Sequence, residues 1–206
     1  MTQIALPLTL PGAAGGAGRI ILGRSNRHVV EAMTRSADWP FRTAILAGPS
    51  RSGKSLLARW FVAGGHGEAI DDADREPEDA LFHHWNRAQA ERRPLLLVSG
   101  AAPGAWRIAL PDLASRLGAA LLLELGAPDD AMLVGLIETH AARRGLALGE
   151  GAVAWLLPRI ERSHAAVEAL IVELDRLSLE RKQAVSLALL RDALAAGGAE
   201  FQPRLL

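Results

Sequence analysis

Residues 48–55, with the sequence GPSRSGKS, have the spacing of a phosphate-binding loop. Two glycines enclose four residues, and a lysine and a serine follow directly, which completes the pattern G-x-x-x-x-G-K-[ST]. In such a loop, backbone N–H groups and the N-terminus of the next helix bind phosphate oxygens. Lys54 is expected to reach the outer phosphates, and the Ser55 hydroxyl to bind Mg²⁺. The predicted nucleotide contacts are Gly48, Pro49, Ser50, Arg51, Ser52, Gly53, Lys54, Ser55 and Leu56.

A short acidic segment, AIDDAD at residues 69–74, supplies carboxylates for the same chemistry. Asp71 is predicted to hold Mg²⁺ through water, and Asp72 to orient the attacking water. Only Ala69 and Ile70 precede these acids as a strand, so a solvated acidic turn is the alternative.

The elements around these residues alternate between strand and helix. TAILAGP before the loop reads as a buried strand, and SLLARWFVA after it reads as a helix. Residues 19–33 read as a strand or turn followed by a helix that Ser25 caps, and PLLLVSG and AALLLEL read as further strands. Only one helix and one strand fit between Ser55 and Asp71. The sequence therefore predicts an α/β fold with a short parallel sheet of four to five strands.

The remaining chain divides into four further parts. Residues 127–198 have helical periodicity throughout and are predicted to form a small all-helical lid domain behind an α/β body at residues 19–126. Residues 12–18, GAAGGAG, are predicted to be a flexible linker that follows a tail at residues 1–11, and residues 199–206 are a C-terminal tail.

Composition narrows the class of protein. The 206 residues contain 23 Lys and Arg and 23 Asp and Glu, which argues against strong direct binding to DNA. There is no cysteine, as is common in a reducing cytoplasm. No segment resembles a signal peptide or an apolar run of the roughly 20 residues that span a bilayer. A cytoplasmic protein without membrane contact is expected.

The order of these motifs resembles the AAA+ domains of the bacterial initiator DnaA and, more closely, of its regulator Hda, here of alphaproteobacterial type. The segment LPDLASRL carries the arginine finger of that family, which the resemblance places on Arg116. ILGRSNR resembles the segment that contacts the nucleotide base, with Asn26 in the matching position. Ser99 stands where the family keeps a polar sensor of the outer phosphate. The second sensor, an arginine of the lid, aligns with Ala165, and Arg162 either substitutes for it or is a solvated arginine.

The tail sequence QIALPL resembles the peptide with which Hda proteins bind the sliding clamp of DNA polymerase III, its beta subunit. The implied contacts are Gln3, Ile4, Leu6, Pro7 and Leu8. An amide and several apolar side chains on a flexible segment suit docking into an apolar pocket. The segment departs from the general motif, because isoleucine stands second and no aromatic residue closes it.

The resemblance implies a negative regulator of chromosomal replication initiation. Docked on a DNA-loaded clamp, the protein would insert Arg116 into the nucleotide site of DnaA and stimulate hydrolysis of its ATP. Its own site would hold ADP or ATP with Mg²⁺, without robust turnover, and association into a homo-oligomer is left open. The alternatives are a self-sufficient P-loop ATPase or kinase, and a truncated DnaA-like initiator or helicase loader. An initiator is expected to carry a helix-turn-helix domain after the lid, where this sequence has AEFQPRLL.

Overall fold

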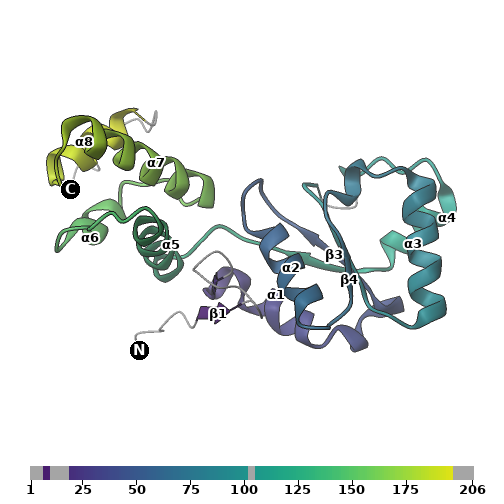
Figure 1. Ribbon diagram of the computed structural model, residues 1–206. Coiled ribbons are helices and arrows are strands. Elements are labelled where there is room, and N and C mark those ends of the chain that lie inside the picture. Colours follow the sequence, from purple (N-terminus) through teal and green to yellow (C-terminus); the bar gives the residue numbers. More distant parts are fainter. Residues whose placement is uncertain (1–6, 10–18, 102–104, 197–206) are drawn as a thin grey trace. The chain divides into compact units, whose positions relative to one another are not determined.

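Strands form where the sequence has short runs of apolar residues. The computed structural model describes residues 7–9, 19–101 and 105–196 (Figure 1). The strands, in chain order, are β1 (Pro7–Thr9), β2 (Arg19–Ile21), β3 (Thr43–Ala47), β4 (Glu68–Ile70), β5 (Leu95–Val98) and β6 (Leu121–Glu124). The helices are α1 (Arg24–Thr34), α2 (Lys54–Ala63), α3 (Glu78–Glu91), α4 (Pro111–Gly118), α5 (Asp130–Arg143), α6 (Ala152–Leu156), α7 (His164–Arg181) and α8 (Leu187–Ala196).

Four of the strands form one parallel sheet in the order β4-β5-β3-β6. Ile45 in the centre pairs with Leu97 on one side and Leu122 on the other. The first two strands form a separate antiparallel pair, in which Leu8 lies opposite Ile20. The fold class predicted from the sequence is confirmed, with four strands as the observed number.

Alternate residues of each strand face opposite sides of the sheet, so each face has its own core. One core contains side chains of β3, β5 and β6 together with those of α1 and α2. The other contains Ile45, Leu95 and Leu97 together with side chains of α3 and α4. Helices α3 and α4 lie next to each other on that face (Figure 1). The β3 strand is buried along its whole length because both faces are covered.

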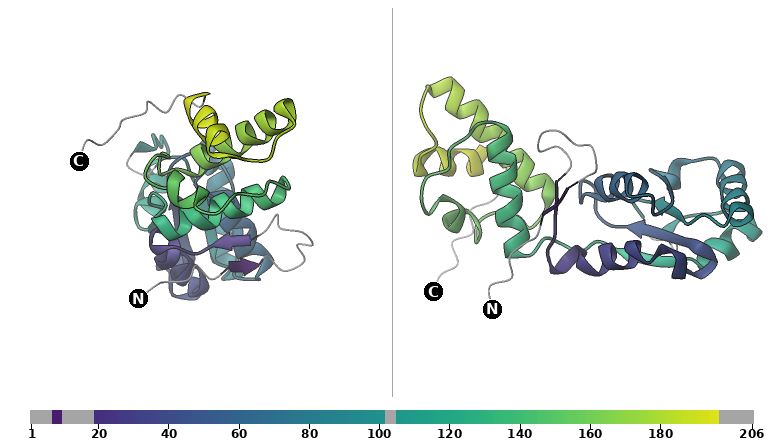
Figure 2. Two further views of the ribbon diagram at one scale, coloured as in Figure 1. Left: turned by 90° about the vertical axis from the view of Figure 1, so that its left-hand side faces the viewer. Right: turned by 60° about the horizontal axis from the view of Figure 1, so that its bottom comes forward.

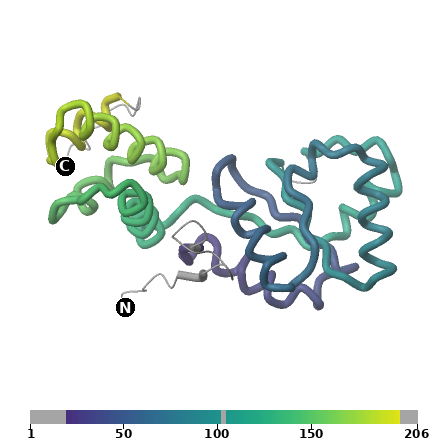
Figure 3. Tube along the Cα trace, viewed as in Figure 1, coloured from purple at the N-terminus to yellow at the C-terminus, as the bar shows by residue number. Residues whose placement is uncertain are grey.

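The contacts within the chain define two units, Pro7–Gly126 and the residues from Ala127 on. In the described chain, the segment after β6 leads from the first unit to the second (Figure 3). In the second unit, α7 packs against both α5 and α8 (Figure 2). Asp129 caps α5 by accepting a hydrogen bond from the Met132 N–H, and Ser163 caps α7 in the same way. All four helices lie in the segment where the sequence predicts a helical lid.

Three local features differ from the prediction. The first is the cap of α1, which begins after Gly23 and uses the side chain of Asn26, whereas Ser25 was expected. The second is α6, which has only five residues, although helical periodicity was expected throughout the lid segment. The third is β1, which forms within the segment that was predicted to be a tail. Within the part of the chain that the structure describes, no helix is long and apolar enough to cross a membrane.

Candidate nucleotide site

The phosphate-binding loop lies between β3 and α2, as the motif requires. Gly48 has φ +154°, and a Cβ there would lie 3.0 Å from the Leu125 Cβ and 3.2 Å from the Leu125 carbonyl oxygen. Gly53, the residue before α2, has φ +93°. Both glycines are therefore required by backbone geometry. The loop leads directly into α2, and the backbone N–H groups at the N-terminus of that helix favour the binding of an anion.

Lys54 is directed at the loop itself. Its ammonium donates hydrogen bonds to the Gly48 and Pro49 carbonyl oxygens, both at 2.7 Å. Burial lowers the pKa of this ammonium, and the carboxylates of Asp71, Asp74 and Asp72 oppose the shift. A cation at the loop with acids beside it is the arrangement in which phosphate oxygens and a divalent ion can be bound together.

The other predicted loop residues share this neighbourhood. Ser55 and Leu56 lie in the first turn of α2, and Pro49, Ser50 and Arg51 are exposed in the loop. The hydroxyl of Ser52 is buried and has no hydrogen-bond partner among the described residues. A buried polar atom without a partner, in a cradle that a Cβ at Gly48 would narrow, suits a bound phosphate.

The acids follow β4, at the carboxyl end of the sheet. Asp71 and Asp72 are exposed, and Asp72 adopts the left-handed conformation, with φ +49°. Asp74, which the sequence analysis left without a role, is less exposed. One of its carboxylate oxygens is buried without a partner in the described chain, and the other would lie 3.6 Å from a Cβ on Gly100. The signal available in the sequence was its position three residues after Asp71.

Ser99 does not present a free hydroxyl. Its side chain is fully buried and donates to the Ala101 carbonyl oxygen, while the Ala101 N–H donates back to it at 2.9 Å. The serine therefore closes the turn after β5. In this structure its hydroxyl caps that turn, and the role of Ser99 as a sensor of an outer phosphate stays a prediction.

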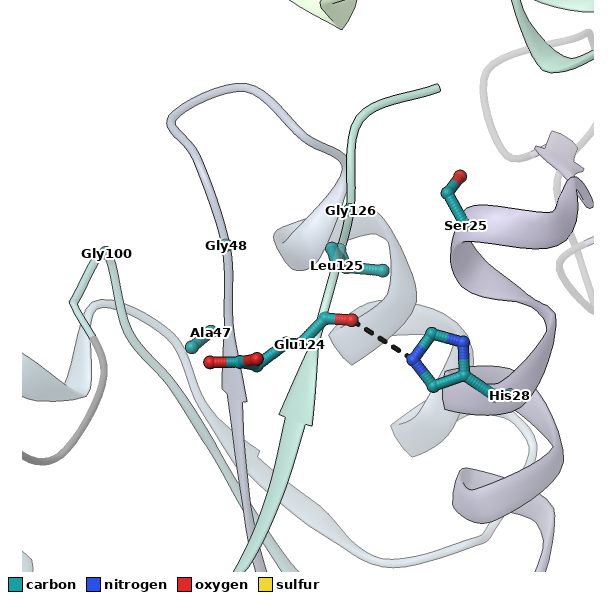
Figure 4. Close-up of a pocket in the computed structure, with 8 residues that line it drawn as sticks. All are labelled: Ser25, His28, Ala47, Gly48, Gly100, Glu124, Leu125 and Gly126. Carbon is teal, nitrogen blue, oxygen red and sulfur yellow. Dashed lines mark hydrogen bonds between the residues drawn. The ribbon is translucent and has the colours of Figure 1, made fainter. Parts of the chain in front are cut away.

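A cavity of about 560 Å³ opens beside the loop. Its lining comes from α1, from the ends of β3 and β6, and from the turn after β5: Ser25, His28, Ala47, Gly48, Gly100, Glu124, Leu125 and Gly126. Figure 4 shows Ser25 and His28 projecting from α1 toward the end of β6, where a His28 ring nitrogen lies 3.2 Å from the Glu124 carbonyl oxygen. The Glu124 carboxylate lies on the side of Ala47, away from His28. The volume is in the range of small-molecule sites.

Asn26, the predicted contact to the base, does not line this cavity. The residue is 4% exposed, accepts a hydrogen bond from the Gly23 N–H at 2.9 Å and donates one to the Ile21 carbonyl at 2.9 Å. The first bond caps the start of α1, and the second joins the helix to the end of β2. The residues of α1 that line the cavity are Ser25 and His28, which the sequence analysis did not assign to nucleotide binding.

Arg116 lies on α4 and is not among the cavity-lining residues. Its guanidinium donates to the Asn86 side-chain oxygen at 2.6 Å and to the Asp112 carboxylate at 2.7 Å. The Cζ atom lies 4.5 Å from the ring centroid of Phe82 and 4.2 Å from that of Trp85. The side chain is 24% exposed. The resemblance implies that Arg116 is an arginine finger; in this structure its guanidinium is held against α3, and the side chain stays partly exposed.

The lid residues are also committed to local partners. Arg162 donates to the Asp130 carboxylate and to the Pro128 carbonyl, so it joins the start of α7 to the start of α5. Ala165 lies in the first turn of α7. Next to it, burial and the nearby His140 lower the pKa of His164 to about 4.

The predicted clamp-binding segment lies mostly outside the described residues, which include neither Gln3, Ile4 nor Leu6. Pro7 and Leu8 are in β1, where their backbone pairs with β2. This part of the predicted tail is joined to the first unit by a two-stranded ladder.

Parallel strands in the order seen here, a phosphate-binding loop motif after β3, acids after β4 and a helical unit after β6 are the arrangement of the AAA+ fold. Domain III of the replication initiation protein DnaA from Thermotoga maritima has a similar fold, with a TM-score of 0.71, 15% identity, and coverage of 86% of this chain and 94% of that one. AMPPCP-bound DnaA from Aquifex aeolicus has a TM-score of 0.60 and 18% identity, and the match covers 79% of this chain and 66% of that one. The Thermotoga maritima RuvB Holliday junction branch migration motor has a TM-score of 0.64 and 17% identity, and the match covers 87% of this chain and 73% of that one.

Residues 130–194 match the family of Hda lid domains. An uncharacterised protein of Haemophilus influenzae is 31% identical over 121 residues, which are 58% of this chain and 52% of that relative. The match thus spans about half the length of the relative. The C-terminal segment of this chain is thus similar to Hda lid domains, and the chain has the fold of DnaA domain III.

Proposed function

We propose that this protein regulates replication initiation by stimulating ATP hydrolysis in a DnaA-type initiator, with Arg116 acting in trans. The observation that carries the proposal is an Hda lid domain joined to a DnaA-like body whose Arg116 lies outside the residues that line its own cavity. An arginine in that position does not serve the protein's own phosphate-binding loop. A guanidinium supplied to a neighbour's nucleotide stabilises the charge of the transferring phosphoryl group.

The body is proposed to bind ADP or ATP. Backbone N–H groups of residues 48–53 and the Lys54 ammonium would hold the phosphates, and Ser25 and His28 would face the rest of the nucleotide. Mg²⁺ would be bound by Ser55 and, through water, by Asp71. Among the described residues, no group of three or more His, Cys, Asp and Glu is arranged to hold a metal ion. Phosphate oxygens and water must therefore supply the other ligands of the ion.

The contacts that hold Arg116 do not forbid a role in trans. Its ion pair with the 65% exposed Asp112 is an i,i+4 helix pair, worth about 0.5 kcal/mol. The two ring contacts contribute about 0.5–1 kcal/mol each, and the bond to Asn86 about 1.5 kcal/mol or more. Losing every contact would cost about 3–5 kcal/mol. A finger in trans is worth about 10³–10⁵ in rate, or about 4–7 kcal/mol, so the gain is as large as the cost.

Robust turnover by the isolated protein is not expected. Ser99 uses its hydroxyl within its own turn, and Ala165 offers no cation at the sensor position that the resemblance assigns to the lid. Both facts favour a regulator that retains its nucleotide over a self-sufficient ATPase. We further propose that residues 3–8 bind the sliding clamp and so bring the protein to DNA where DnaA is met.

The test measures ATP hydrolysis by DnaA with DNA-loaded clamp present. Wild-type protein is expected to raise the rate, and Arg116→Ala to lose most of the stimulation. Arg107→Ala is the matched control, because Arg107 is an exposed arginine of the segment leading to α4 and is expected to leave stimulation unchanged. Equal stimulation by wild type and Arg116→Ala would refute the role of the finger. Retention of Gln3→Ala on immobilised clamp at the wild-type level would refute the docking segment.

A further inference from the structure

Arg116 is enclosed by side chains from two helices. Phe82 and Trp85, which are three residues apart on α3, place ring centroids 4.5 and 4.2 Å from its Cζ atom. Asn86 on the same helix accepts from one Nη at 2.6 Å, and Asp112 on α4 accepts from the other at 2.7 Å. We call these four residues the Arg116 cage.

The packing of α3 and α4 against the sheet does not depend on the Arg116 cage alone. The contact between the two helices and the sheet already includes Leu81, Ala88, Leu113 and Leu117, each no more than 2% exposed. Arg116 adds to the rim of this packed core, where its side chain remains 24% exposed. Asp112 alone could pair with the charge of an arginine at the rim, whereas the two rings and Asn86 also fix where its guanidinium lies.

We propose that Phe82, Trp85 and Asn86 are positioning residues for Arg116, and that Asp112 is the resident anion which the partner's phosphate replaces. This inference rests on the proposed function in trans. Ring faces attract a guanidinium without using its N–H groups, so stacking fixes its plane and leaves donors along its edge. Asn86 holds one end of the group in place.

Asp112 differs from the other three residues because it is mostly exposed and charged. A phosphate carries more negative charge than a carboxylate and accepts paired N–H bonds from a guanidinium in the same manner. Exchange of Asp112 for phosphate therefore requires no movement of the rings. A finger held in this way loses little conformational entropy when the complex forms, and displacement by about 1 Å can cost about 100-fold in rate.

The experiment compares wild type with Trp85→Leu, Trp85→Phe and Asp112→Asn, using the DnaA hydrolysis assay with DNA-loaded clamp and a titration of this protein. Trp85→Leu is expected to lower the maximal stimulated rate by about tenfold or more. Trp85→Phe should restore most of it, because the ring face is kept and the unpaired indole N–H is removed. Asp112→Asn should raise stimulation at subsaturating protein, because a competing charge is lost. Trp155→Leu, which removes the ring beneath Arg159 in the lid, is the control and should match wild type.

A second measurement is independent of activity. The Nε–H resonance of Arg116, assigned by its absence in Arg116→Lys, should be displaced by the ring currents, less so in Trp85→Leu, and nearly as in wild type in Trp85→Phe. If Trp85→Leu does not fold, Asn86→Ala replaces it, with a lower maximal rate expected.

The two proposals fail in different ways. If wild type does not stimulate DnaA, or if Arg116→Ala stimulates it equally, the proposed function is wrong. The positioning role of the Arg116 cage is then wrong as well, even where the resonance shows the rings in contact with Arg116. If stimulation depends on Arg116 while a folded Trp85→Leu equals or exceeds wild type, the positioning role alone is overturned. An undisplaced Nε–H resonance in wild type would also overturn it.

Discussion

Replacing Asn26 by alanine distinguishes the role that resemblance assigns to this residue from the one that the structure assigns. The side chain is 4% exposed and joins the N–H of Gly23 to the carbonyl of Ile21 through its own oxygen and nitrogen. Alanine removes both bonds and leaves both backbone groups buried. If Asn26 binds the base, the change should act on nucleotide affinity, whereas a structural role predicts a loss of stability.

The expected loss follows from the two bonds. A net hydrogen bond contributes about 0.5–1.5 kcal/mol, and a buried group left without a partner costs about 1–3 kcal/mol. Two such groups at the start of one helix give an expected destabilisation of about 2–6 kcal/mol. For a unit the size of Pro7–Gly126, about 4 °C per kcal/mol is typical, so the melting temperature should fall by about 8–24 °C.

Thermal unfolding followed by circular dichroism measures the loss, and titration with a fluorescent nucleotide below the transition measures affinity. His28→Ala is the opposite case on the same helix. It lines the cavity and is exposed, so it should weaken nucleotide binding with little change in melting temperature. A wild-type melting temperature for Asn26→Ala, together with lost nucleotide binding, would refute the structural reasoning.

Three further predictions concern the loop and the lid. Gly48→Ala should destabilise the body and impair nucleotide binding, because the added Cβ would lie too close to the Leu125 carbonyl oxygen. The control is Gly65→Ala, where φ is +70° and no atom lies within 4 Å of the added Cβ, so the free energy of unfolding should fall by only about 1 kcal/mol. Equal melting temperatures for the two variants would contradict this prediction. Lys54→Ala should weaken nucleotide binding by about tenfold or more in a titration. Because burial lowers the pKa of Lys54, its ammonium should lose its proton as the pH rises, and the affinity of the wild type should begin to decline at a pH below the usual lysine range. Because the pKa of His164 is about 4 when folded and 6.5 otherwise, the unfolded chain binds an extra proton between these values, and stability of the lid should fall as pH drops from 6.5 to 4, by at most about 3 kcal/mol. Hydrogen exchange of α7 at pH 5 and 7.5 measures this, and a His164→Leu variant with the same pH dependence would show the assignment to be wrong.

The sequence by itself determined the strands of the parallel sheet and their order along the chain. Apolar runs at β3, β5 and β6 are buried strands because a parallel sheet covered on both faces admits little else. The loop motif requires glycine at positions 48 and 53, and both have positive φ because the tight turn depends on local backbone geometry. The distance between Ser55 and Asp71 limited the predicted sheet to four or five strands, since chain length limits how many elements a connection can hold, and the structure has four.

Side-chain partners were settled only by the tertiary structure. Arg116 contacts Asn86 across 30 residues, a distance in sequence at which no local period operates. The Ser99 hydroxyl bonds to the backbone of Ala101 in its own turn, and the Asn26 amide donates to the Ile21 carbonyl of β2. Buried backbone groups need hydrogen-bond partners, and the folded chain brings these side chains within reach of them. Spacing along a chain determines which face of an element a residue occupies, whereas the packing of separate elements determines which atoms that residue meets.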